Sequence, residues 1–372
     1  MTKMMSNHSS RVLHVIDHLI PASGVASIVM LYITGIKDIP QDVAAFGECN
    51  AKMEKTITQA GGKVHKLPHI NKAFGYQYSK SFKQLLSDNQ YSIVHGHLLN
   101  AAFIYLKQAK KHGVSHRIIH SHNAVLADTR LKQIRNGILS YNIPNWANSF
   151  IAVSSGAAKC AFGKSLKNLD DVKIIFNGVD TNRFSFNPIV RAETRGELGI
   201  SDNTLCIGHV GRFAQQKNHD FLIDIFKQIH SQPNTVLLLV GDGHLEETIK
   251  SKVNELGLSD CVKFLGSRSD VQRLYQAFDV FLLPSLFEGF PLVAVEAQCA
   301  GLGCVLPEYL PKEIKCREDV VFLPIKNPAD WAKAALDLAN KPRQDGSADV
   351  ISAKLDIASM CGSISDIYKT ML

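Results

Sequence analysis

The strongest constraint on the fold is an alternation of short apolar runs, rich in β-branched residues, with longer amphipathic segments. Strands separated by helices are typical of βαβ units, whose strands lie parallel in one sheet. The alternation occurs in two successive series. The expected strands are Arg11–Ile16, Asp42–Phe46, Lys63–Leu67, Ser92–His95, His116–His120 and Phe150–Val153 in the first series, and Leu205–Val210, Val236–Val240, Val262–Leu265, Val280–Leu283 and Cys304–Leu306 in the second. The sequence therefore predicts an α/β protein with two doubly wound, Rossmann-like domains that face a central cleft.

The segment Ser185–Gly199, which contains Pro188 and a mixed-charge helix, separates the two series and is the expected linker. A chain of 372 residues has room for two domains of roughly 150–200 residues. We expect residues 1–184 to form the first domain and residues 185–355 the second. The amphipathic segment 356–372 is expected to cross back and pack on the first domain.

Composition places the chain among ordinary globular proteins, with 45% apolar and 20% charged residues. No apolar run reaches the roughly 18 residues that span a bilayer. The polar start MTKMMSNHSS does not resemble a signal peptide. The eight cysteines form no CxxC pair, which favours reduced thiols over a disulfide framework or a zinc site. We therefore expect a cytoplasmic protein.

The charge is distributed unevenly along the chain. Residues 1–185 contain 22 Lys and Arg against 10 Asp and Glu, whereas residues 186–372 contain 19 against 24. A basic front half suggests an anionic partner, such as a phospholipid surface, a lipid diphosphate or nucleic acid. An ordinary basic surface is the alternative, and no nucleic-acid-binding module is recognisable.

Two glutamates mark the most informative stretch, PSLFEGFPLVAVEA at 284–297. Glu288 lies in a loop after an apolar strand, and Pro291 is suited to the first turn of a helix that contains Glu296. A carboxylate among apolar neighbours is costly unless it accepts hydrogen bonds. Ribose hydroxyls could supply them to Glu296, and hydroxyls of a transferred sugar could supply them to Glu288. A capping glutamate and a salt-bridged glutamate are the structural alternatives.

Two cations follow another strand, in GRFAQQKN at 211–218. Arg212 offers a planar fork and Lys217 a point charge, which together suit a diphosphate, although either residue alone would be an ordinary surface cation. VGDG at 240–243 is a strand-end glycine turn without the GxGxxG spacing, and it is a weak signal alone. The turn Asn177–Asp180 is explained by turn chemistry.

These four motifs occur in the order of a known family. The Glu-x7-Glu spacing with Gly-Phe-Pro inside it, GRFAQQKN, IFNGVDTNRF and VGDG resemble the signatures of retaining glycosyltransferases of family GT4, which have the GT-B fold. The resemblance implies that Arg212 and Lys217 bind the diphosphate of a nucleotide-sugar donor, that Glu288 contacts the donor sugar, and that Glu296 binds the ribose. Further donor contacts are expected at Gly24, Gly211, Gly241, Gly289 and Phe290.

The same resemblance implies chemistry without a metal or other cofactor, because Arg, Lys and helix dipoles neutralise the leaving group. It implies a hexose, expected as a UDP-sugar, transferred with retention of configuration. The glutamate pair is then not the nucleophile and acid of a glycosidase.

In the first domain, IIHSHN at 118–123 resembles the strand end where these enzymes place a histidine near donor sugar and acceptor. We favour His122 as this residue, with His120 as the alternative. His95 and His97 also lie at a strand end. Four histidines suggest a metal, but the absence of acidic partners argues against it.

Three features depart from the family pattern. Ser23-Gly24 stands where Gly-Gly is frequent, Gly303 replaces a proline, and LPEYLPKE at 306–313 replaces a glycine-rich turn. The last change weakens any expectation of donor-sugar contacts from that loop.

HSHN at 120–123 and KEI at 312–314 are most similar to bacterial exopolysaccharide and capsule glycosyltransferases. The implied acceptor is a glycan or a polyprenyl-diphosphate-linked sugar at the inner membrane face. Lys72–Lys83, with its interleaved aromatic residues, is the expected membrane-approaching segment, and an ordinary surface helix is the alternative. A sugar-nucleotide epimerase or phosphorylase, or a non-catalytic partner of another transferase, are the other functions considered.

Overall fold

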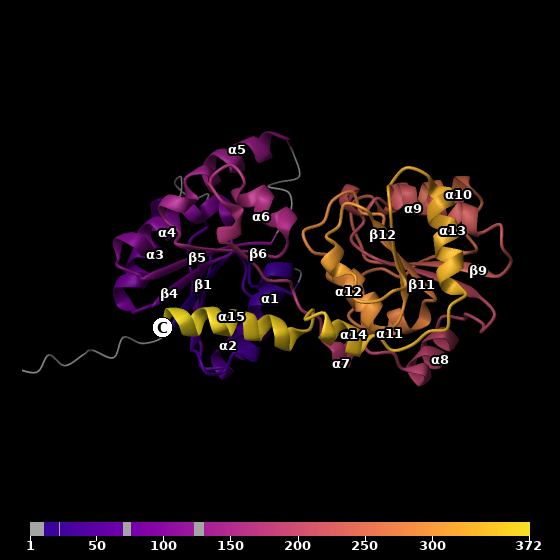
Figure 1. Cartoon of the computed structure of the whole chain (residues 1–372), viewed down its shortest axis with the longest axis horizontal. Coiled ribbons are helices and arrows are strands. Elements are labelled where there is room, and N and C mark those ends of the chain that lie inside the picture. Colours follow the sequence, from indigo (N-terminus) through magenta and orange to yellow (C-terminus); the bar gives the residue numbers. More distant parts are fainter. Residues whose placement is uncertain (1–10, 22, 70–75, 123–129) are drawn as a thin grey trace, which may run out of the picture. The chain divides into compact units, whose positions relative to one another are not determined.

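The computed structural model describes residues 11–21, 23–69, 76–122 and 130–372. The chain forms two compact units (Figure 1). The first contains the described residues up to Asn177 together with Ile357–Leu372, and the second contains Gly178–Asp356. The boundary between the first and the second unit thus lies between residues 177 and 178. We expected it between residues 184 and 185.

The first unit contains a seven-stranded parallel sheet in the order β3-β2-β1-β4-β5-β6-β7. Its strands are β1 (Val12–Ile16), β2 (Gln41–Ala45), β3 (Val64–Lys66), β4 (Ile93–Gly96), β5 (His116–Ser121), β6 (Ser149–Ala152) and β7 (Val172–Ile174). Sequence analysis missed only β7, a three-residue edge strand that is mostly exposed. The strand order reverses between β1 and β4, the place where ligands bind in open α/β sheets.

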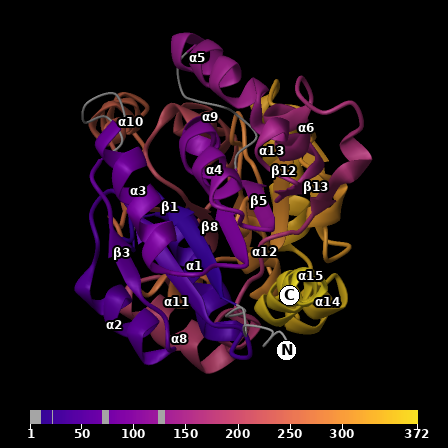
Figure 2. The ribbon, with the colours of Figure 1, turned by 90° about the vertical axis from the view of Figure 1, so that its left-hand side faces the viewer.

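The helices of the first unit are α1 (Gly24–Gly35), α2 (Ala51–Gln59), α3 (Tyr76–Asp88), α4 (Ala102–Lys111), α5 (Arg130–Tyr141), α6 (Ser155–Phe162) and α15 (Ile357–Met371), with 3-10 turns at Leu99–Ala101, Ile143–Asn145 and Leu169–Asp171. Side-chain oxygens of Ser23, Asn50 and Ser154 accept hydrogen bonds from the first turns of α1, α2 and α6. Helices α3 and α4 lie side by side (Figure 2), where Gln108 Nε2 donates to Ser79 Oγ over 2.8 Å.

The C-terminal helix α15 packs on α1 of the first unit. Cys361 Sγ donates to the Leu31 carbonyl over 3.4 Å, and Lys369 pairs with Asp38 over 2.8 Å. Tyr368 is buried, and its hydroxyl lies 2.6 Å from His95 Nδ1. The last helix therefore completes the core beside β1 and β4.

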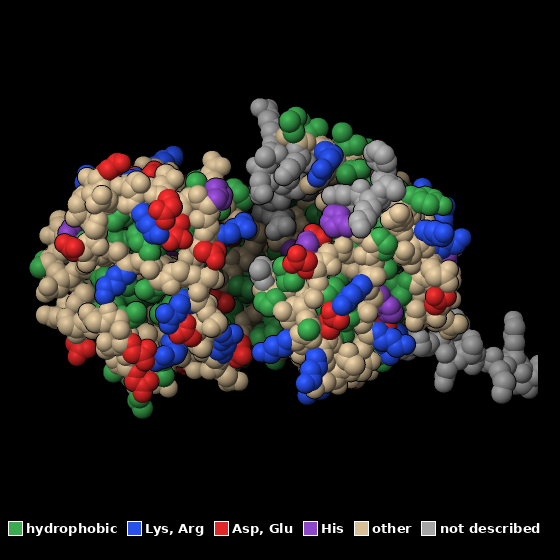
Figure 3. Space-filling model, turned by 180° about the vertical axis from the view of Figure 1, so that it is seen from behind, with side chains coloured by type: hydrophobic (Ala, Val, Ile, Leu, Met, Phe, Trp, Pro, Cys, Tyr) green, Lys and Arg blue, Asp and Glu red, His purple; other side chains and the backbone are tan. Residues whose placement is uncertain are grey.

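The expected membrane-approaching segment Lys72–Lys83 lies partly outside the described residues, which resume at Tyr76. Tyr78 and Phe82 are fully buried, because they face the core beneath α3. These two rings cannot contact a membrane, so this part of the prediction was wrong, whereas Tyr76 of the same segment is 69% exposed. Exposed apolar side chains lie instead on α5, a helix that we did not expect, and Figure 3 shows hydrophobic side chains gathered over it.

The second unit contains a six-stranded parallel sheet in the order β10-β9-β8-β11-β12-β13. Its strands are β8 (Leu205–Val210), β9 (Thr235–Val240), β10 (Val262–Phe264), β11 (Val280–Leu282), β12 (Gly303–Pro307) and β13 (Val320–Leu323), and its helices are α7 (Thr181–Phe184), α8 (Pro188–Glu197), α9 (His219–Ile229), α10 (Glu246–Glu255), α11 (Val271–Ala277), α12 (Leu292–Cys299), α13 (Pro328–Ala339) and α14 (Ser347–Ser352). Two 3-10 turns occur at Gln215–Lys217 and Lys312–Ile314. The strand order reverses between β8 and β11. Together the two sheets confirm the predicted doubly wound α/β class.

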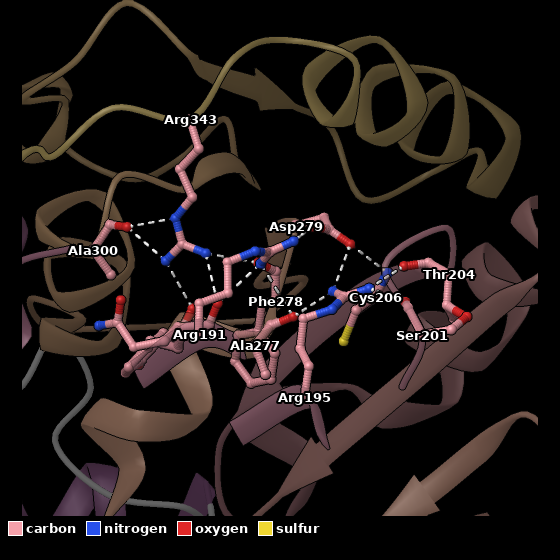
Figure 4. A network of polar contacts seen from close by, with 12 residues as sticks. Arg191, Arg195, Ser201, Thr204, Cys206, Ala277, Phe278, Asp279, Ala300 and Arg343 are labelled. Atoms are coloured by element: carbon pink, nitrogen blue, oxygen red, sulfur yellow. Dashed lines mark hydrogen bonds and ion pairs between the residues drawn. The ribbon is translucent and has the colours of Figure 1, made fainter. Parts of the chain in front are cut away.

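The expected linker Ser185–Gly199 is not a linker, because its helix α8 is bound into the second unit (Figure 4). Arg191 and Arg195 both bind Asp279, just before β11, over 2.5 and 3.2 Å. Arg343 donates to backbone carbonyls at the ends of α11 and α12, including the Ala300 carbonyl at 2.6 Å. This arginine network lies at the amino ends of the strands and leaves their carboxyl ends for ligands.

Candidate active site

Two glycine-containing turns meet at the carboxyl ends of β8 and β9. Gly211 N donates to the Val240 carbonyl over 2.9 Å, and Phe213 N donates to the Asp242 carbonyl over 2.7 Å. Gly241 has φ +139°, and a Cβ there would lie 2.1 Å from the Gly211 carbonyl oxygen. Only glycine allows this approach of the two backbones. The VGDG motif thus shapes the loop that carries the two cations.

The loop after β11 is bonded to the same region. Leu286 N donates to the Gln216 carbonyl over 2.8 Å, and Gln216 Nε2 returns a bond to the Phe287 carbonyl over 3.0 Å. Asn218, in the left-handed conformation with φ +55°, donates from Nδ2 to the Pro284 carbonyl over 3.1 Å. The two loops on either side of the strand-order reversal are therefore held as one surface.

Lys217 and Glu288 form an ion pair across these loops, with Nζ 2.7 Å from Oε1. Their side chains are only 14% and 8% exposed, and Gln216 Nε2 donates to the other carboxylate oxygen over 3.2 Å. The stem of Lys217 passes Gly211 so closely that a Cβ there would lie 3.0 Å from Lys217 Cγ and Cδ. The glycine therefore makes room for the lysine.

Glu296 lies in α12 close to this pair. The Tyr275 hydroxyl donates to its Oε2 over 3.0 Å. Desolvation raises the pKa of Glu296 from 4.5 to about 7, opposed by the Tyr275 hydrogen bond and by the positive charges of Arg183 and Lys217. A buried acid whose pKa is raised to near neutrality, on a helix that follows a strand end, is a typical mark of a functional site.

Five histidines gather around the strand-order reversal of the first sheet, on or directly after β1, β4 and β5. His14 in β1 is paired in register with His95 in β4, and His97 follows β4. His120 lies in the buried part of β5, and His122 comes directly after that strand. Their rings stack with neighbouring centroids 4.2–5.7 Å apart. Sequence analysis found four of these residues and missed His14.

Three of the rings form a hydrogen-bonded row that ends on an amide. His122 Nε2 lies 2.9 Å from His97 Nδ1, His97 Nε2 lies 3.0 Å from His14 Nδ1, and His14 Nε2 lies 2.9 Å from Gln41 Oε1. Burial lowers the pKa of His14 and of His122 to about 4, and that of His97 well below its ordinary value. The row is therefore neutral at pH 7.

The histidines are also close enough to ligate a metal. His14, His95 and His97 form one such group, and His97, His120 and His122 form another. Both nitrogens of His120 and Nε2 of His95 are buried without a hydrogen-bond partner among the described residues. In the row, however, each nitrogen of His97 is already matched by another imidazole. The nitrogens of the row therefore match one another, whereas those of His120 and Nε2 of His95 stay unmatched, and both candidate groups consist of histidines alone.

Two family models match the chain, one for glycosyl transferases group 1 over residues 190–349 and one for Glycosyltransferase Family 4 over residues 42–183. The chain is a GT4-type glycosyltransferase.

Relatives and solved structures agree with this assignment over nearly the whole chain. EpsF of Bacillus subtilis, whose name places it among the glycosyltransferases, is 28% identical over 98% of this chain and 97% of its own. An Escherichia coli UDP-Gal:alpha-D-GlcNAc-diphosphoundecaprenol alpha-1,3-galactosyltransferase is 31% identical over 61% of this chain and 60% of its own. The structure of Anabaena Alr3699/HepE in complex with UDP superposes with a TM-score of 0.79 at 20% identity, covering 97% of this chain and all of that one. The two units thus have the GT-B fold.

In this glycosyltransferase the predicted donor residues of the second unit differ in their surroundings. Lys217, Glu288 and Glu296 are brought together in the second unit, where Gly211 and Gly241 permit the loop geometry. Phe290 is buried, and Gly289 lies in the same loop. Arg212 is exposed, and its side chain makes no hydrogen bond or ion pair within the described part of the chain. The role of each residue toward a donor stays a prediction.

Gly24 and His122 belong to the first unit. Gly24 begins α1, where its neighbour Ser23 is the N-cap, and a Cβ at Gly24 would meet nothing within 4 Å. Packing within this unit therefore does not require glycine there. His120 is fully buried whereas His122 is partly exposed, which favours His122 as the ring that can reach a ligand.

Three further residues support the site and were missed from sequence. Tyr275 binds Glu296, Gln216 binds Glu288, and Gln41 ends the histidine row. Gln216 could have been found from its place inside GRFAQQKN, whereas Tyr275 and Gln41 lie in no recognised motif.

None of the helices in the described part of the chain has both the length and the apolar composition needed to cross a bilayer.

Proposed function

We propose that this glycosyltransferase moves a hexose from a UDP-sugar, with retention of configuration and without a metal, to a glycan or polyprenyl-diphosphate-linked acceptor in bacterial exopolysaccharide or capsule synthesis. The observation that supports it best is the grouping of Lys217, Glu288 and Glu296 at the strand-order reversal of the second sheet. HepE, which shares the fold, binds UDP and UDP-glucose in its solved structures. The E. coli relative is named for a UDP-sugar donor and a diphosphoundecaprenol-linked acceptor.

On the donor side, Glu296 accepts hydrogen bonds from the ribose hydroxyls, and Glu288 accepts them from the sugar. Lys217, already held by Glu288 at 2.7 Å, adds a bond to the diphosphate with another of its three N–H groups. The exposed Arg212 guanidinium binds a second phosphate oxygen. Two cations then compensate the negative charge that grows on the departing UDP, so no metal is needed.

The transfer breaks the bond between sugar C1 and the diphosphate oxygen, and the acceptor hydroxyl forms the new bond to C1 from the same face. The hydroxyl proton passes to the leaving phosphate oxygen, which leaves UDP and the glycosylated acceptor. Neither glutamate has to act as a nucleophile, since Glu288 is engaged with Lys217 and Gln216. His122 lies in the other unit and contacts sugar or acceptor hydroxyls.

Membrane contact, if the acceptor is lipid-linked, is assigned to α5 in place of Lys72–Lys83. Leu131, Ile134, Ile138 and Tyr141 are 82%, 58%, 70% and 60% exposed. Their spacing of three, four and three residues places them on one helix face. The sequence of α5 contains three Lys or Arg and no Asp or Glu. An apolar face on a basic helix matches an anionic bilayer surface.

The α5 assignment is tested by co-sedimentation with vesicles of phosphatidylglycerol and phosphatidylcholine, against phosphatidylcholine alone. The enzyme should bind the anionic vesicles, and Ile138→Asp should lose that binding. Ile189→Asp is the matched control, because Ile189 is a 69% exposed residue on α8 of the second unit. Binding that survives Ile138→Asp, or α5-dependent self-association without vesicles, removes the membrane from the proposal.

The donor is tested by thermal shift with UDP, GDP, ADP and TDP, followed by the corresponding nucleotide sugars. A ligand that binds only the folded state stabilises it by about 2.7 kcal/mol at a hundredfold excess over its Kd. UDP should be the strongest stabiliser, and EDTA should not change the result. Product analysis with the stabilising UDP-sugar then distinguishes the alternatives, since an epimerase changes the donor without an acceptor and a non-catalytic partner changes nothing. Preference for another base, or loss of binding with EDTA, contradicts the proposal.

A further inference from the structure

The hydrogen bonds of the histidine row in the first unit all run in the same donor-to-acceptor direction. The side-chain amide of Gln41 fixes this direction. This residue is 3% exposed. Its Nε2 lies 3.1 Å from the Tyr32 carbonyl oxygen and 3.1 Å from the Ile36 carbonyl oxygen. Both of these partners can only accept hydrogen bonds, so the NH2 group must face them. The Oε1 atom therefore faces His14, and the amide cannot turn over without losing two bonds.

Each contact in the row needs one donor and one acceptor. The protonated nitrogen of one ring therefore determines the protonated nitrogen of the next ring. Gln41 Oε1 only accepts, so His14 Nε2 must carry the proton. A neutral His14 then has a bare Nδ1, which makes His97 Nε2 the donor at 3.0 Å. The same step makes His122 Nε2 the donor to His97 Nδ1 at 2.9 Å.

We propose that Gln41, acting through His14 and His97, fixes the tautomer of His122, so that its Nδ1 is a hydrogen-bond acceptor for a sugar or acceptor hydroxyl. The function of that acceptor rests on the proposed transferase activity, whereas the tautomers themselves do not. Gln41, His14 and His97 are positioning residues, and His122 is the residue that meets the substrate. The opposite tautomer would present an N–H, which could not accept a hydroxyl proton.

The surroundings of the row keep it neutral. Protonation of His14 or of His97 would make two N–H groups face each other at about 3 Å, which is a repulsive contact. Tyr32, Tyr368 and His95 are the polar rings packed around His14, and Asp42 is the only acid that exerts an electrostatic effect on it within the described chain. That carboxylate is engaged by Arg11, by Tyr91 at 2.8 Å and by the Lys63 amide.

The test is a long-range ¹H–¹⁵N correlation spectrum of the ¹⁵N-labelled full chain, which shows for each imidazole the nitrogen that carries the proton. At pH 7 His14, His97 and His122 should all be neutral with the proton on Nε2. Gln41→Met removes the fixed acceptor, after which either direction satisfies the contacts between the rings. The nitrogen shifts of all three rings should then move together toward averaged values.

Tyr368→Phe is the matched control. It removes a buried hydroxyl that lies 2.6 Å from His95 Nδ1 in the same cluster but outside the row. The shifts of the three row histidines should stay in place. The spectrum of the unsubstituted protein decides the tautomers even if Gln41→Met fails to fold.

Three results would overturn the inference. His122 could be charged or protonated on Nδ1 at pH 7, or Gln41→Met could move the shifts of His14 alone. The purified protein could also hold a stoichiometric metal, detected by elemental analysis, with the ring nitrogens as its ligands. A transferase assay separates the two proposals, because an inactive protein with the predicted tautomers refutes the function and leaves the row intact.

Discussion

Nucleotide binding should depend on pH through Glu296, because the proposed ribose contact requires the ionised carboxylate. Desolvation places the pKa of Glu296 at about 7 in the unliganded protein. Hydroxyl groups that donate to a carboxylate favour its charged form, so the bound state should have a lower pKa. Binding near neutrality must then release a proton. The other groups that act on this carboxylate are Tyr275, Arg183 and Lys217.

The size of the effect follows from the ionised fraction. With a pKa of about 7, roughly one molecule in eleven is ionised at pH 6 and roughly ten in eleven at pH 8. If only the ionised form binds, the apparent Kd is the intrinsic Kd divided by that fraction. UDP should therefore bind about tenfold more weakly at pH 6 than at pH 8. About half a proton should leave per UDP bound at pH 7.

Isothermal titration calorimetry in two buffers with different ionisation enthalpies measures both quantities. The phosphate of UDP titrates by itself near pH 6, so the comparison must be made with Glu296→Gln, which keeps a hydrogen-bonding side chain that cannot ionise. In this variant the Kd of UDP should keep only the pH dependence that comes from the UDP phosphate, and lose the part that comes from Glu296. Equal pH ratios for both proteins, or tighter binding in acid, would falsify the idea that ionised Glu296 holds the ribose.

Other predictions concern the neighbours of Glu296 and the stability of each unit. Lys217→Ala should weaken UDP by about tenfold to a hundredfold, the loss of one charge-assisted bond, and unchanged calorimetric affinity would remove the lysine from the site. Glu288→Gln should abolish transfer while UDP still binds within a few-fold, and equal loss of both would make the residue a structural support. Gly241→Ala should lower the stability by about 3 kcal/mol or more in thermal denaturation, because the new Cβ would lie 2.1 Å from the Gly211 carbonyl oxygen. Gly196→Ala on α8 is the control and should not destabilise, because a Cβ there meets no atom within 4 Å. The pKa of His14 is about 4 in the folded protein, so between pH 4 and 6.5 this residue binds fewer protons in the folded than in the unfolded chain. Acidification from pH 7 to 5 should therefore lower the stability of the first unit by about 2 kcal/mol from His14 alone. A urea midpoint of that unit that does not change with pH would contradict the buried, neutral state of His14.

The sequence predicted most strands because parallel strands buried on both faces are continuous apolar runs. β8 matches its expected range, Leu205–Val210, and every residue of β1 is buried. The missed strands β7 and β13 are short edge strands with partly exposed side chains, so they lack that signal. Pattern reasoning succeeds where burial alone decides the residue types.

The linker prediction failed for a reason that sequence cannot reveal. Arg191 and Arg195 look like the charged face of a solvated helix, but Asp279 binds both of them from more than eighty positions away. In the same way, Gln41 and His14 are single polar residues in apolar runs until the fold places them side by side. Long-range polar contacts of this kind leave no periodic trace in the chain.

The donor motifs were predictable as a group because they follow neighbouring strands of one sheet. Their pairing was not, since Glu288 and Lys217 were each expected to face a ligand, and nothing in the sequence indicated that they also bind each other. Such a pair holds the cation in place before the diphosphate arrives, and the ligand does not have to order a flexible lysine. It also gives the Glu288 carboxylate, which is 8% exposed, a positively charged partner.

The two sheets present different chemistry at equivalent places, and the difference suits two kinds of ligand atom. At its strand-order reversal the second sheet presents opposite charges, with a lysine, an exposed arginine and two carboxylates, which can bind a charged diphosphate together with ribose and sugar hydroxyls. The first sheet presents a row of neutral imidazoles, whose charge is suppressed by burial. A neutral acceptor can bind a sugar hydroxyl without attracting the diphosphate toward it. Replacing that row by a charged group should therefore disturb the placement of the sugar before it disturbs the binding of the nucleotide.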